Sequence, residues 1–353
     1  MPMSGTFSLS PLERRGLITW YSANKRDLPW RRASNPYAIW VSEIMLQQTR
    51  ASTVVPYFER WMQRFPTVDS LASADPDEAF ALWQGLGYYR RCRLLLKGAQ
   101  WVKEHGMPRT EEAWKNVPGV GRYTAAAISS IAFNSPSAVV DGNVARVYAR
   151  HNVCWEIGES LIAAARKWAD ASLDREHPGE WNQALMELGA TLCKPRAPDC
   201  THCPLRTGCN AHRRKIAHLL PKPRPAPETV RIEHLVWAPF HEGAFGFRKI
   251  PNKQWWSGLW EFPRTALNDE TGNAPIGENQ RLRKLGGQGW LEHLGTVRHH
   301  VTHHRITIQC WILRAKKRSK KLRWVEAADL DRVPLPSPQR RVANLALRQL
   351  GRL

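Results

Sequence analysis

The run of alternating prolines at residues 221–227, Pro-Lys-Pro-Arg-Pro-Ala-Pro, divides the chain into two parts of different character. Proline fixes its own φ angle and lacks an N–H, so this run can form neither a helix interior nor a central strand and is typical of an extended linker. Before it, residues 8–192 carry apolar side chains at helical spacing, punctuated by Pro, Gly and short polar stretches. Helices are expected at 36–49, 76–84, 88–104, 121–132, 142–151, 159–171 and 180–192.

After the linker the pattern changes to short β-rich segments separated by turns. Strands are expected at 229–239, 244–249, 295–301 and 305–313. A chain of 353 residues suits two domains. We therefore predict a multidomain α+β protein: a helical domain at 1–218, a linker at 219–229 and a smaller α/β domain at 230–353.

The chain is strongly basic, with 52 Lys and Arg against 31 Asp and Glu, a formal charge of +21. The excess is shared, because residues 1–229 contribute +9 and residues 230–353 contribute +12. A polyanion such as nucleic acid is the first partner to consider. The ten residues Arg314–Arg323 include seven basic ones and are expected to form a solvated hairpin tip, with a phosphate contact as the alternative.

Neither export nor membrane insertion is expected. Residues 1–15 have no apolar core of the kind found in a signal peptide, and the chain has no run of about 18 apolar residues. We expect a cytoplasmic, nucleoid-associated monomer.

Four of the seven cysteines lie within 17 residues, in the pattern C-x6-C-x2-C-x5-C. Such a cluster in a chain otherwise poor in cysteine indicates a metal site and not a disulfide framework. Four thiolates suit structural zinc or an iron–sulfur cluster, and a single C-x2-C pair favours the latter because zinc ribbons usually have two. The four cysteines are Cys193, Cys200, Cys203 and Cys209.

A glycine-containing turn, Val-Pro-Gly-Val-Gly-Arg-Tyr at 117–123, lies between two expected helices. Gly119 and Gly121 permit a tight turn whose N–H groups can bind a phosphate, although an ordinary helix–helix turn would explain them equally well. Further along, Asp141 follows an apolar stretch and precedes the helix at 142–151. We expect it to cap that helix and to stay ionised, which leaves a purely structural role open.

Glu43 lies on the apolar helix expected at 36–49, where its neighbours one turn away are Ile39, Trp40, Leu46 and Gln47. Burial disfavours the charged form of a carboxyl group, so its pKa should rise. Two carboxyls whose environments move their pKa values in opposite directions suit acid–base chemistry on a glycosidic bond. The alternative is a structural Glu43 paired with Arg26 or Arg31.

Taken together, these motifs resemble the MutY-type adenine DNA glycosylases of the helix-hairpin-helix superfamily. The resemblance spans residues 10–215 and, more loosely, the rest of the chain. The segments that carry it are Leu-Pro-Trp-Arg at 28–31, Val-Ser-Glu-Ile-Met-Leu-Gln-Gln-Thr at 41–49, Gly-Leu-Gly-Tyr-Tyr at 85–89, the turn at 117–123, Val-Val-Asp-Gly-Asn-Val at 139–144 and the four-cysteine loop at 193–209.

The resemblance implies a base-excision repair glycosylase that hydrolyses adenine mispaired with 8-oxoguanine or guanine in double-stranded DNA. Glu43 would protonate adenine, and Asp141 would stabilise the oxocarbenium-like sugar. The resemblance also implies that Tyr123 and Asn143 support that intermediate and that the flipped base is held by Trp30, Arg31 and Glu187. Three residues would wedge into the duplex: Gln48, Leu86 and Tyr88. Gly119 and Gly121 would hold a phosphate, and the four cysteines would bind a [4Fe–4S] cluster.

Tyr123 separates this chain from the related endonuclease III-type enzymes, which carry a lysine there and use its amine for strand cleavage. A tyrosine has no such amine, so a monofunctional glycosylase is expected. The rival hypotheses are an endonuclease III-like pyrimidine or mismatch glycosylase, and a non-catalytic iron–sulfur DNA-binding protein.

The C-terminal part resembles the Nudix-like domain that reads oxidised guanine in this family, with Gly-Leu-Trp-Glu-Phe-Pro at 258–263 as its characteristic strand. Residues 264–283 lack the Glu cluster of a Nudix hydrolase, so a recognition module is expected. The family's Phe-Ser-His is replaced by Val301, Thr302 and His303. Thr302 and His303 keep hydrogen-bonding groups, whereas Val301 loses the aromatic wedge.

Overall fold

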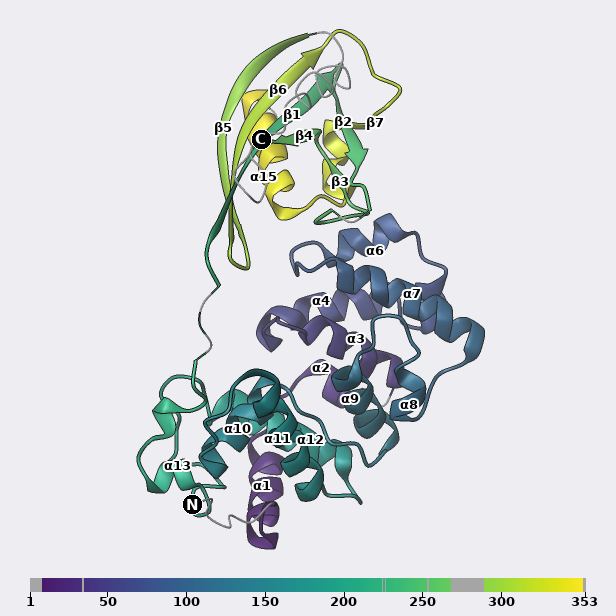
Figure 1. Cartoon of the computed structure of the whole chain (residues 1–353). Helices are drawn as coiled ribbons and strands as arrows, with labels where there is room; N and C mark the ends of the chain where they lie inside the picture. Colours follow the sequence, from purple (N-terminus) through teal and green to yellow (C-terminus); the bar gives the residue numbers. More distant parts are fainter. Residues whose placement is uncertain are drawn as a thin grey trace. The chain divides into compact units, whose positions relative to one another are not determined.

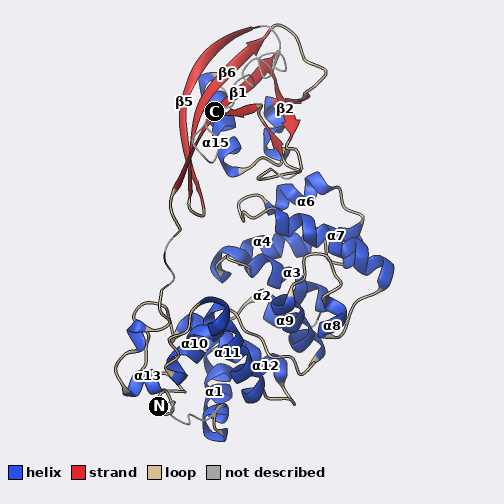
Figure 2. Ribbon diagram, viewed as in Figure 1, coloured by secondary structure: helices blue, strands red, loops and turns tan. Residues whose placement is uncertain are grey.

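The computed structural model describes residues 8–33, 35–223, 225, 227–252, 254–267 and 289–351. Its contacts divide the chain into two compact units: 1–73 with 94–225, and 74–93 with 226–353. The first is helical and the second contains the sheet (Figures 1 and 2). The domain boundaries drawn at the proline-rich segment stay a prediction.

The first unit is built from helices whose starts follow local capping rules. Ser10 and Glu13 form a capping box at the first helix, Asn35 caps the third, and Asp141 caps the tenth. The helices are α1 (Pro11–Asn24), α2 (Pro29–Arg32), α3 (Pro36–Leu46), α4 (Ala51–Arg64), α5 (Val68–Ala72), α7 (Arg90–His105), α8 (Glu111–Trp114), α9 (Arg122–Phe133), α10 (Gly142–Asn152), α11 (Gly158–Ser172), α12 (Pro178–Thr191), α13 (Asn210–Arg213) and the 3-10 turn η1 (Ala217–Leu219); α7 begins in the other unit.

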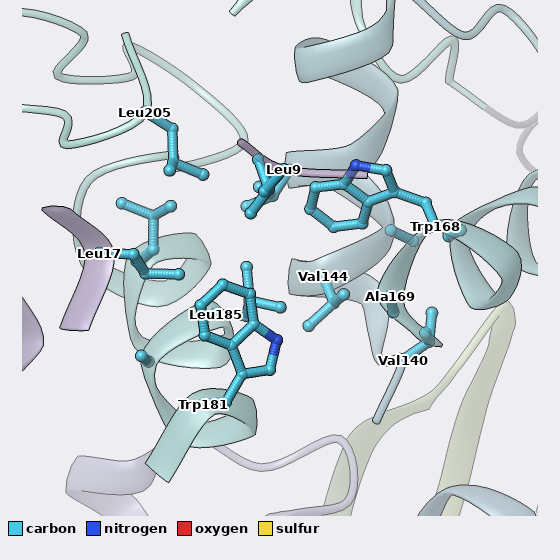
Figure 3. Packing of buried hydrophobic residues seen from close by; sticks show 14 of the residues in the cluster. Leu9, Leu17, Val140, Val144, Trp168, Ala169, Trp181, Leu185 and Leu205 are labelled. Atoms are coloured by element: carbon cyan, nitrogen blue, oxygen red, sulfur yellow. The ribbon is translucent and has the colours of Figure 1, made fainter. Parts of the chain in front are cut away.

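A core of large apolar side chains joins α1, α10, α11 and α12 (Figure 3). Leu17, Trp168, Trp181 and Leu185 have at most 1% of their surface exposed and belong to one packed cluster. Leu205, from the four-cysteine loop, packs into the same cluster. The loop is therefore anchored on the helices that carry Asp141 and Glu187.

The second unit centres on a mixed sheet in the order β3-β2-β1-β6-β5, with β4 on β1 and β7 on β2. β1 and β6 run parallel, with Val236 opposite Cys310, and the other pairs are antiparallel. The strands are β1 (Val230–His241), β2 (Ala244–Lys249), β3 (Trp260–Glu261), β4 (Arg264–Ala266), β5 (Gly289–Val301), β6 (His304–Ala315) and β7 (Arg323–Glu326).

Helical elements complete this unit: α6 (Pro76–Trp83), η2 (Ala327–Arg332) and α15 (Ser337–Gln349). Val342 and Ala346 of α15 are buried in the core under the sheet with Phe245 and Phe262. This helix was not predicted, because prolines at 334, 336 and 338 obscured its start. The basic run from Arg314 to Arg323 was predicted to be a hairpin tip, and this is wrong: it connects β6 to β7, which do not pair with each other because β7 pairs with β2.

Residues 74–93 group with the sheet because Asp77 binds three of its side chains. The carboxylate of Asp77 accepts hydrogen bonds from the indole of Trp260 at 2.7 Å and from Arg323 at 3.0 Å, and Lys249 lies 3.4 Å away. The guanidinium of Arg323 and the amine of Lys249 also lie 4.8 and 5.3 Å from the centroid of the Trp260 ring.

The predicted mixture of a helical part and an α/β part is confirmed. Within the described ranges, no helix is long and apolar enough to cross a membrane.

Two leucines on α1 give a matched test of the core. Leu17 is fully buried, whereas Leu12 is 70% exposed. Leu17→Ala should lower the free energy of unfolding by about 2–5 kcal/mol because it removes packed methyl groups and leaves a cavity, and Leu12→Ala should change it by less than about 0.5 kcal/mol. Urea unfolding of both variants measures the difference. Equal losses would contradict this packing.

Candidate active site

One cavity of about 680 Å³ in the first unit brings together side chains that are far apart in the sequence. Glu43 enters from α3, Tyr123 from the start of α9, Asp141 and Asn143 from the start of α10, and Glu187 from α12. Trp30 and Arg31 of α2 line it as well. All four residues predicted to act in the chemistry, and all three predicted to hold the base, therefore share one cavity.

Glu43 is 5% exposed, on a helix whose residues from Tyr37 to Met45 are all buried. The hydroxyl of Tyr123 donates a hydrogen bond to its Oε2 at 3.0 Å. Burial raises the pKa of Glu43 to about 7; the negative charge of Asp141 adds to the rise, while the Tyr123 hydroxyl and Arg31 oppose it. The side chain is thus a weak acid that can hold a proton near neutral pH.

Asp141 caps α10 as predicted. Its Oδ1 accepts hydrogen bonds from the backbone N–H groups of Asn143 and Val144, each at 2.8 Å, and its Oδ2 accepts from the Asn143 amide at 2.7 Å. We expected these bonds to move its pKa opposite to that of Glu43, and this is wrong in direction. Burial raises the pKa of Asp141 despite the three hydrogen bonds, because the cap lies inside the same cavity as Glu43.

Glu187 is buried between two arginines. Arg26 donates to it from its backbone N–H and from two guanidinium nitrogens at 2.7–3.0 Å, and Arg31 donates at 2.8 Å. Burial alone would raise the pKa of Glu187, but these hydrogen bonds lower it to about 2. The two arginines considered as structural partners of Glu43 therefore bind Glu187. Sequence reasoning named Arg26 only as a possible partner of Glu43 and missed its contact with Glu187, which is 161 residues away in the chain.

Arg146 is a residue that sequence reasoning missed. Its guanidinium donates to the side-chain oxygen of Asn143 at 2.7 Å, to the carbonyl of Gly189 at 2.7 Å and to the carbonyl of Cys193 at 2.8 Å. It therefore fixes Asn143 on one side and the start of the four-cysteine loop on the other. Its place one turn after Asn143 on α10 was the available signal.

The glycine turn before α9 has the predicted form. Gly119 has a φ of +86°, and a Cβ there would lie 2.5 Å from the Cβ of Leu94, so glycine is required. Gly121 is the N-cap of α9, and no side chain caps the helix there. Free N–H groups at a helix start suit an anion.

Comparison with known proteins assigns both parts of the chain. Residues 41–170 match the HhH-GPD superfamily of base excision DNA repair proteins, and residues 235–345 match the NUDIX domain family. The adenine DNA glycosylase of Rattus norvegicus is 38% identical over 85% of this chain and 70% of its own length. The chain belongs to the adenine DNA glycosylase family.

Other members agree. The adenine DNA glycosylase of Homo sapiens is 37% identical over 84% of this chain and 66% of its own length, and that of Buchnera aphidicola subsp. Baizongia pistaciae is 29% identical over 91% and 93%. A thermostable thymine-DNA glycosylase superposes with a TM-score of 0.51 at 26% identity, over 57% of this chain and 97% of its own. The protein is a base excision repair glycosylase that acts on adenine.

The four cysteines lie together in the loop after α12. Burial raises the pKa of Cys203 to about 12 and also raises those of Cys200 and Cys209, and neighbouring cysteines add to each rise. Arg150 donates to the sulfur of Cys193 at 3.3 Å and to the carbonyls of Lys194 and Pro195. Among the residues that the structure describes, no group of three or more His, Cys, Asp or Glu is arranged to hold a metal ion. The chemistry of the loop, four thiols beside a guanidinium group, nevertheless fits a cluster bound by thiolates.

The remaining residues expected to contact DNA lie outside the cavity. Gln48 is exposed just after α3. In the second unit, Tyr88 is 47% exposed, whereas Leu86 is only 6% exposed. Thr302 and His303 form the turn between β5 and β6. The roles expected for these five residues from the adenine glycosylase family stay predictions.

The raised pKa of Glu43 predicts a pH-dependent effect on stability. Below the ordinary pKa of 4.5, Glu43 is buried in its protonated form and costs the folded state no charge burial. As pH rises through about 7, the buried group ionises and the folded protein loses stability. Glu43→Gln should therefore unfold like the parent near pH 4 and be more stable by about 3 kcal/mol at pH 8. Urea unfolding at both pH values measures this. The exposed Glu104→Gln is the control, and a pH-independent difference for Glu43→Gln would contradict the burial of its charge.

Proposed function

We propose that the enzyme hydrolyses the glycosidic bond of adenine paired with 8-oxoguanine or guanine in duplex DNA, without cleaving the strand. The observation that carries this proposal is a carboxyl group with a pKa near 7, Glu43, in the same cavity as the capped carboxylate of Asp141. A proton donor and a negative charge side by side are what departure of a neutral base from a sugar requires.

In the proposed reaction Glu43 gives its proton to adenine, at N7, and the bond between the base and the sugar then breaks. The electron pair of that bond leaves with the base, and the sugar becomes positively charged. Asp141 stabilises this charge, and Asn143, held by Arg146, keeps Asp141 in place. Water adds to the sugar, and its proton passes to Glu43, which restores the acid. Tyr123 holds Glu43 by its hydroxyl throughout.

The base reaches this cavity only if its nucleotide leaves the stack, which costs a few kcal/mol. We propose that Trp30, Arg31 and Glu187 hold the extruded adenine. Trp30 is fixed by an edge-to-face contact with Phe58 at 5.4 Å, and Arg31 by Glu187. The pocket is therefore assembled before the base arrives, which reduces the ordering cost of binding.

Strand cleavage would need an amine to form a Schiff base with the sugar. No lysine is found among the described residues that line the cavity, and Tyr123 stands where the lyases carry one. A monofunctional glycosylase follows. We propose further that Gln48, Leu86 and Tyr88 enter the duplex, that the turn with Gly119 and Gly121 binds a backbone phosphate, and that Thr302 and His303 contact the base opposite adenine.

For the cysteine loop we propose a [4Fe–4S] cluster held by Cys193, Cys200, Cys203 and Cys209. When bound, the cluster would cross-link the loop and leave no open ligand position for catalysis. Arg146 and Arg150 would hold the loop against α10 through its backbone carbonyls and the Cys193 sulfur.

A single-turnover assay on a duplex with adenine opposite 8-oxoguanine tests the proposed reaction. The strand should be cut only after hot alkali, because excision leaves an abasic site and no lyase acts. Glu43→Gln should lower the rate by at least about 100-fold while leaving duplex binding intact, since only the proton donor is lost. Cleavage without alkali would point to an endonuclease III-like lyase. Normal excision by Glu43→Gln would falsify the mechanism.

Replacement of one cysteine separates structure from chemistry. Cys200→Ser should weaken DNA binding or folding, because the loop loses a cluster ligand. Single-turnover excision at saturating enzyme, measured on the folded fraction, should change by less than about threefold, since the cluster has no free position for substrate. The reverse pattern, normal affinity with a large loss in rate, would show that the cluster takes part in the reaction.

A further inference from the structure

The connection between β6 and β7 carries a charge that the candidate active site does not use. Its residues 316–322 include four lysines and one arginine, and neither Asp nor Glu. Like charges repel one another across so short a loop, and their repulsion is relieved when an anion binds. The connection is therefore a candidate for binding a polyanion.

The arginines and the lysines of this basic run have different partners. Each arginine donates to a carboxylate of the same unit: Arg314 to Glu292, Arg318 to Glu326 and Arg323 to Asp77, at 2.6, 3.1 and 3.0 Å. The four lysines are exposed, and no carboxylate in the described part of the chain forms an ion pair with any of them. These residues, called the lysine cluster below, are Lys316, Lys317, Lys320 and Lys321.

The backbone that carries the lysine cluster is fixed to the sheet. The indole of Trp324 donates to the carbonyl of Ser319 at 2.9 Å, and His241 donates from Nδ1 to the carbonyl of Ala315 at 2.8 Å. The N–H of Leu322 also donates to the Ser319 carbonyl, at 3.2 Å, and the Leu322 side chain is only 7% exposed. Because the loop is ordered before a ligand arrives, binding costs less conformational entropy than it would in a disordered basic tail.

The lysine cluster and the β5–β6 turn lie at opposite ends of the sheet (Figure 1). β6 runs from His304, beside the turn, to Ala315, beside the connection. At about 3.3 Å per residue the two ends of this strand are about 36 Å apart, which is close to one helical turn of DNA. The turn carries Thr302 and His303, for which we propose contact with the base opposite adenine. The lysine cluster is therefore too far from that base to read it.

The phosphate backbone of a duplex is the polyanion that fits this position. It carries one negative charge per about 1.7 Å of helix axis, so neighbouring lysines on a short loop can each contact a phosphate. Lysine binds phosphate as a point charge and reads no base in doing so. A duplex held at the β5–β6 turn also presents its flanking phosphates at a high effective concentration.

We propose that the lysine cluster binds the phosphate backbone of the duplex about one helical turn away from the mispair. The position of the mispair rests on the proposed function, which places the β5–β6 turn at the base opposite adenine. The contact adds affinity that does not depend on sequence, and it slows the release of the enzyme from ordinary DNA.

The test compares the parent with a variant in which all four lysines are replaced by glutamine, both carrying Glu43→Gln so that the adenine stays in place. The first duplex has roughly 40 base pairs, with adenine opposite 8-oxoguanine at its centre. On it the variant should bind at least about tenfold more weakly at low salt, and the slope of log Kd against log salt concentration should fall by about 2–4, near 0.9 for each lost phosphate contact. The substitutions are Lys316→Gln, Lys317→Gln, Lys320→Gln and Lys321→Gln.

A shorter duplex tests the position of the contact. A duplex of roughly 12 base pairs with the same central mispair ends about 20 Å from it, at about 3.4 Å per base pair. It cannot reach a site about 36 Å away. The parent and the glutamine variant should therefore bind this short duplex with affinities within about twofold of each other.

Two further variants separate charge from folding. Replacement of the same four lysines by arginine keeps the charge and should restore the affinity and salt slope of the parent. Arg332→Gln removes an exposed arginine of the same unit whose charge is already paired with Asp329 at 3.3 Å, and it should change the slope by less than about 0.5. All these variants should unfold in urea like the parent, because the side chains are exposed.

Three results would overturn the proposal. An unchanged affinity and slope on the long duplex would reject the lysine cluster as a DNA contact. An equal loss on the short and long duplexes would show that the cluster acts at the mispair, and a loss that arginine does not restore would show that charge is not the cause. Each of these spares the proposed function as long as the parent excises adenine. If the parent does not excise adenine, the proposed function fails, and the same comparison on a long unmodified duplex still tests the phosphate contact.

Discussion

The removal of the Glu43 carboxyl group from water is the constraint around which the helical unit is built. An unpaired buried charge is far more costly than a buried neutral acid, so α3 can bury Glu43 among apolar neighbours only if the group keeps its proton or has a partner. Tyr123 provides a single neutral hydrogen bond, which orients the carboxyl group without forcing it to ionise. For Tyr123 and Asp141 to lie beside Glu43, the first turns of α9 and α10 must both lie next to α3.

Glu187 shows how much depends on the partner. It lines the same cavity and is as deeply buried as Glu43, yet its pKa falls to about 2 while that of Glu43 rises to about 7. The difference comes from Arg26 and Arg31, which both bind Glu187. By engaging these arginines, Glu187 keeps full positive charges from pairing directly with Glu43. One acid is thereby fixed as a structural anion and the other remains a proton donor.

Much of this could be predicted from sequence. The spacing of apolar residues located α3, α10 and four of the strands, and the apolar neighbours of Glu43 were visible within one helical turn. Long-range contacts could not be predicted, because the partners lie far apart in the sequence: Arg26 and Glu187 are 161 residues apart. The rise in the pKa of Asp141 was missed because its hydrogen bonds are local and its burial is not. The attachment of residues 74–93 to the sheet depends on Asp77, which looks like any residue in a helical first turn.

Several residues that were predicted separately to contact DNA share one backbone feature, a positive φ. Nine described residues other than glycine have a positive φ, and several of them end a helix or turn a hairpin, as Asn134, Val153 and Glu242 do. Gln48, Tyr88 and Thr302 are different, because each is predicted to contact DNA, and Trp256 lies in the turn before β3. Glycine would adopt these conformations at lower cost but has no side chain to place against a base. Holding an aromatic, amide or hydroxyl group in this strained form requires the fixed turns around it, which accounts for the dense hydrogen bonding at residues 250–259.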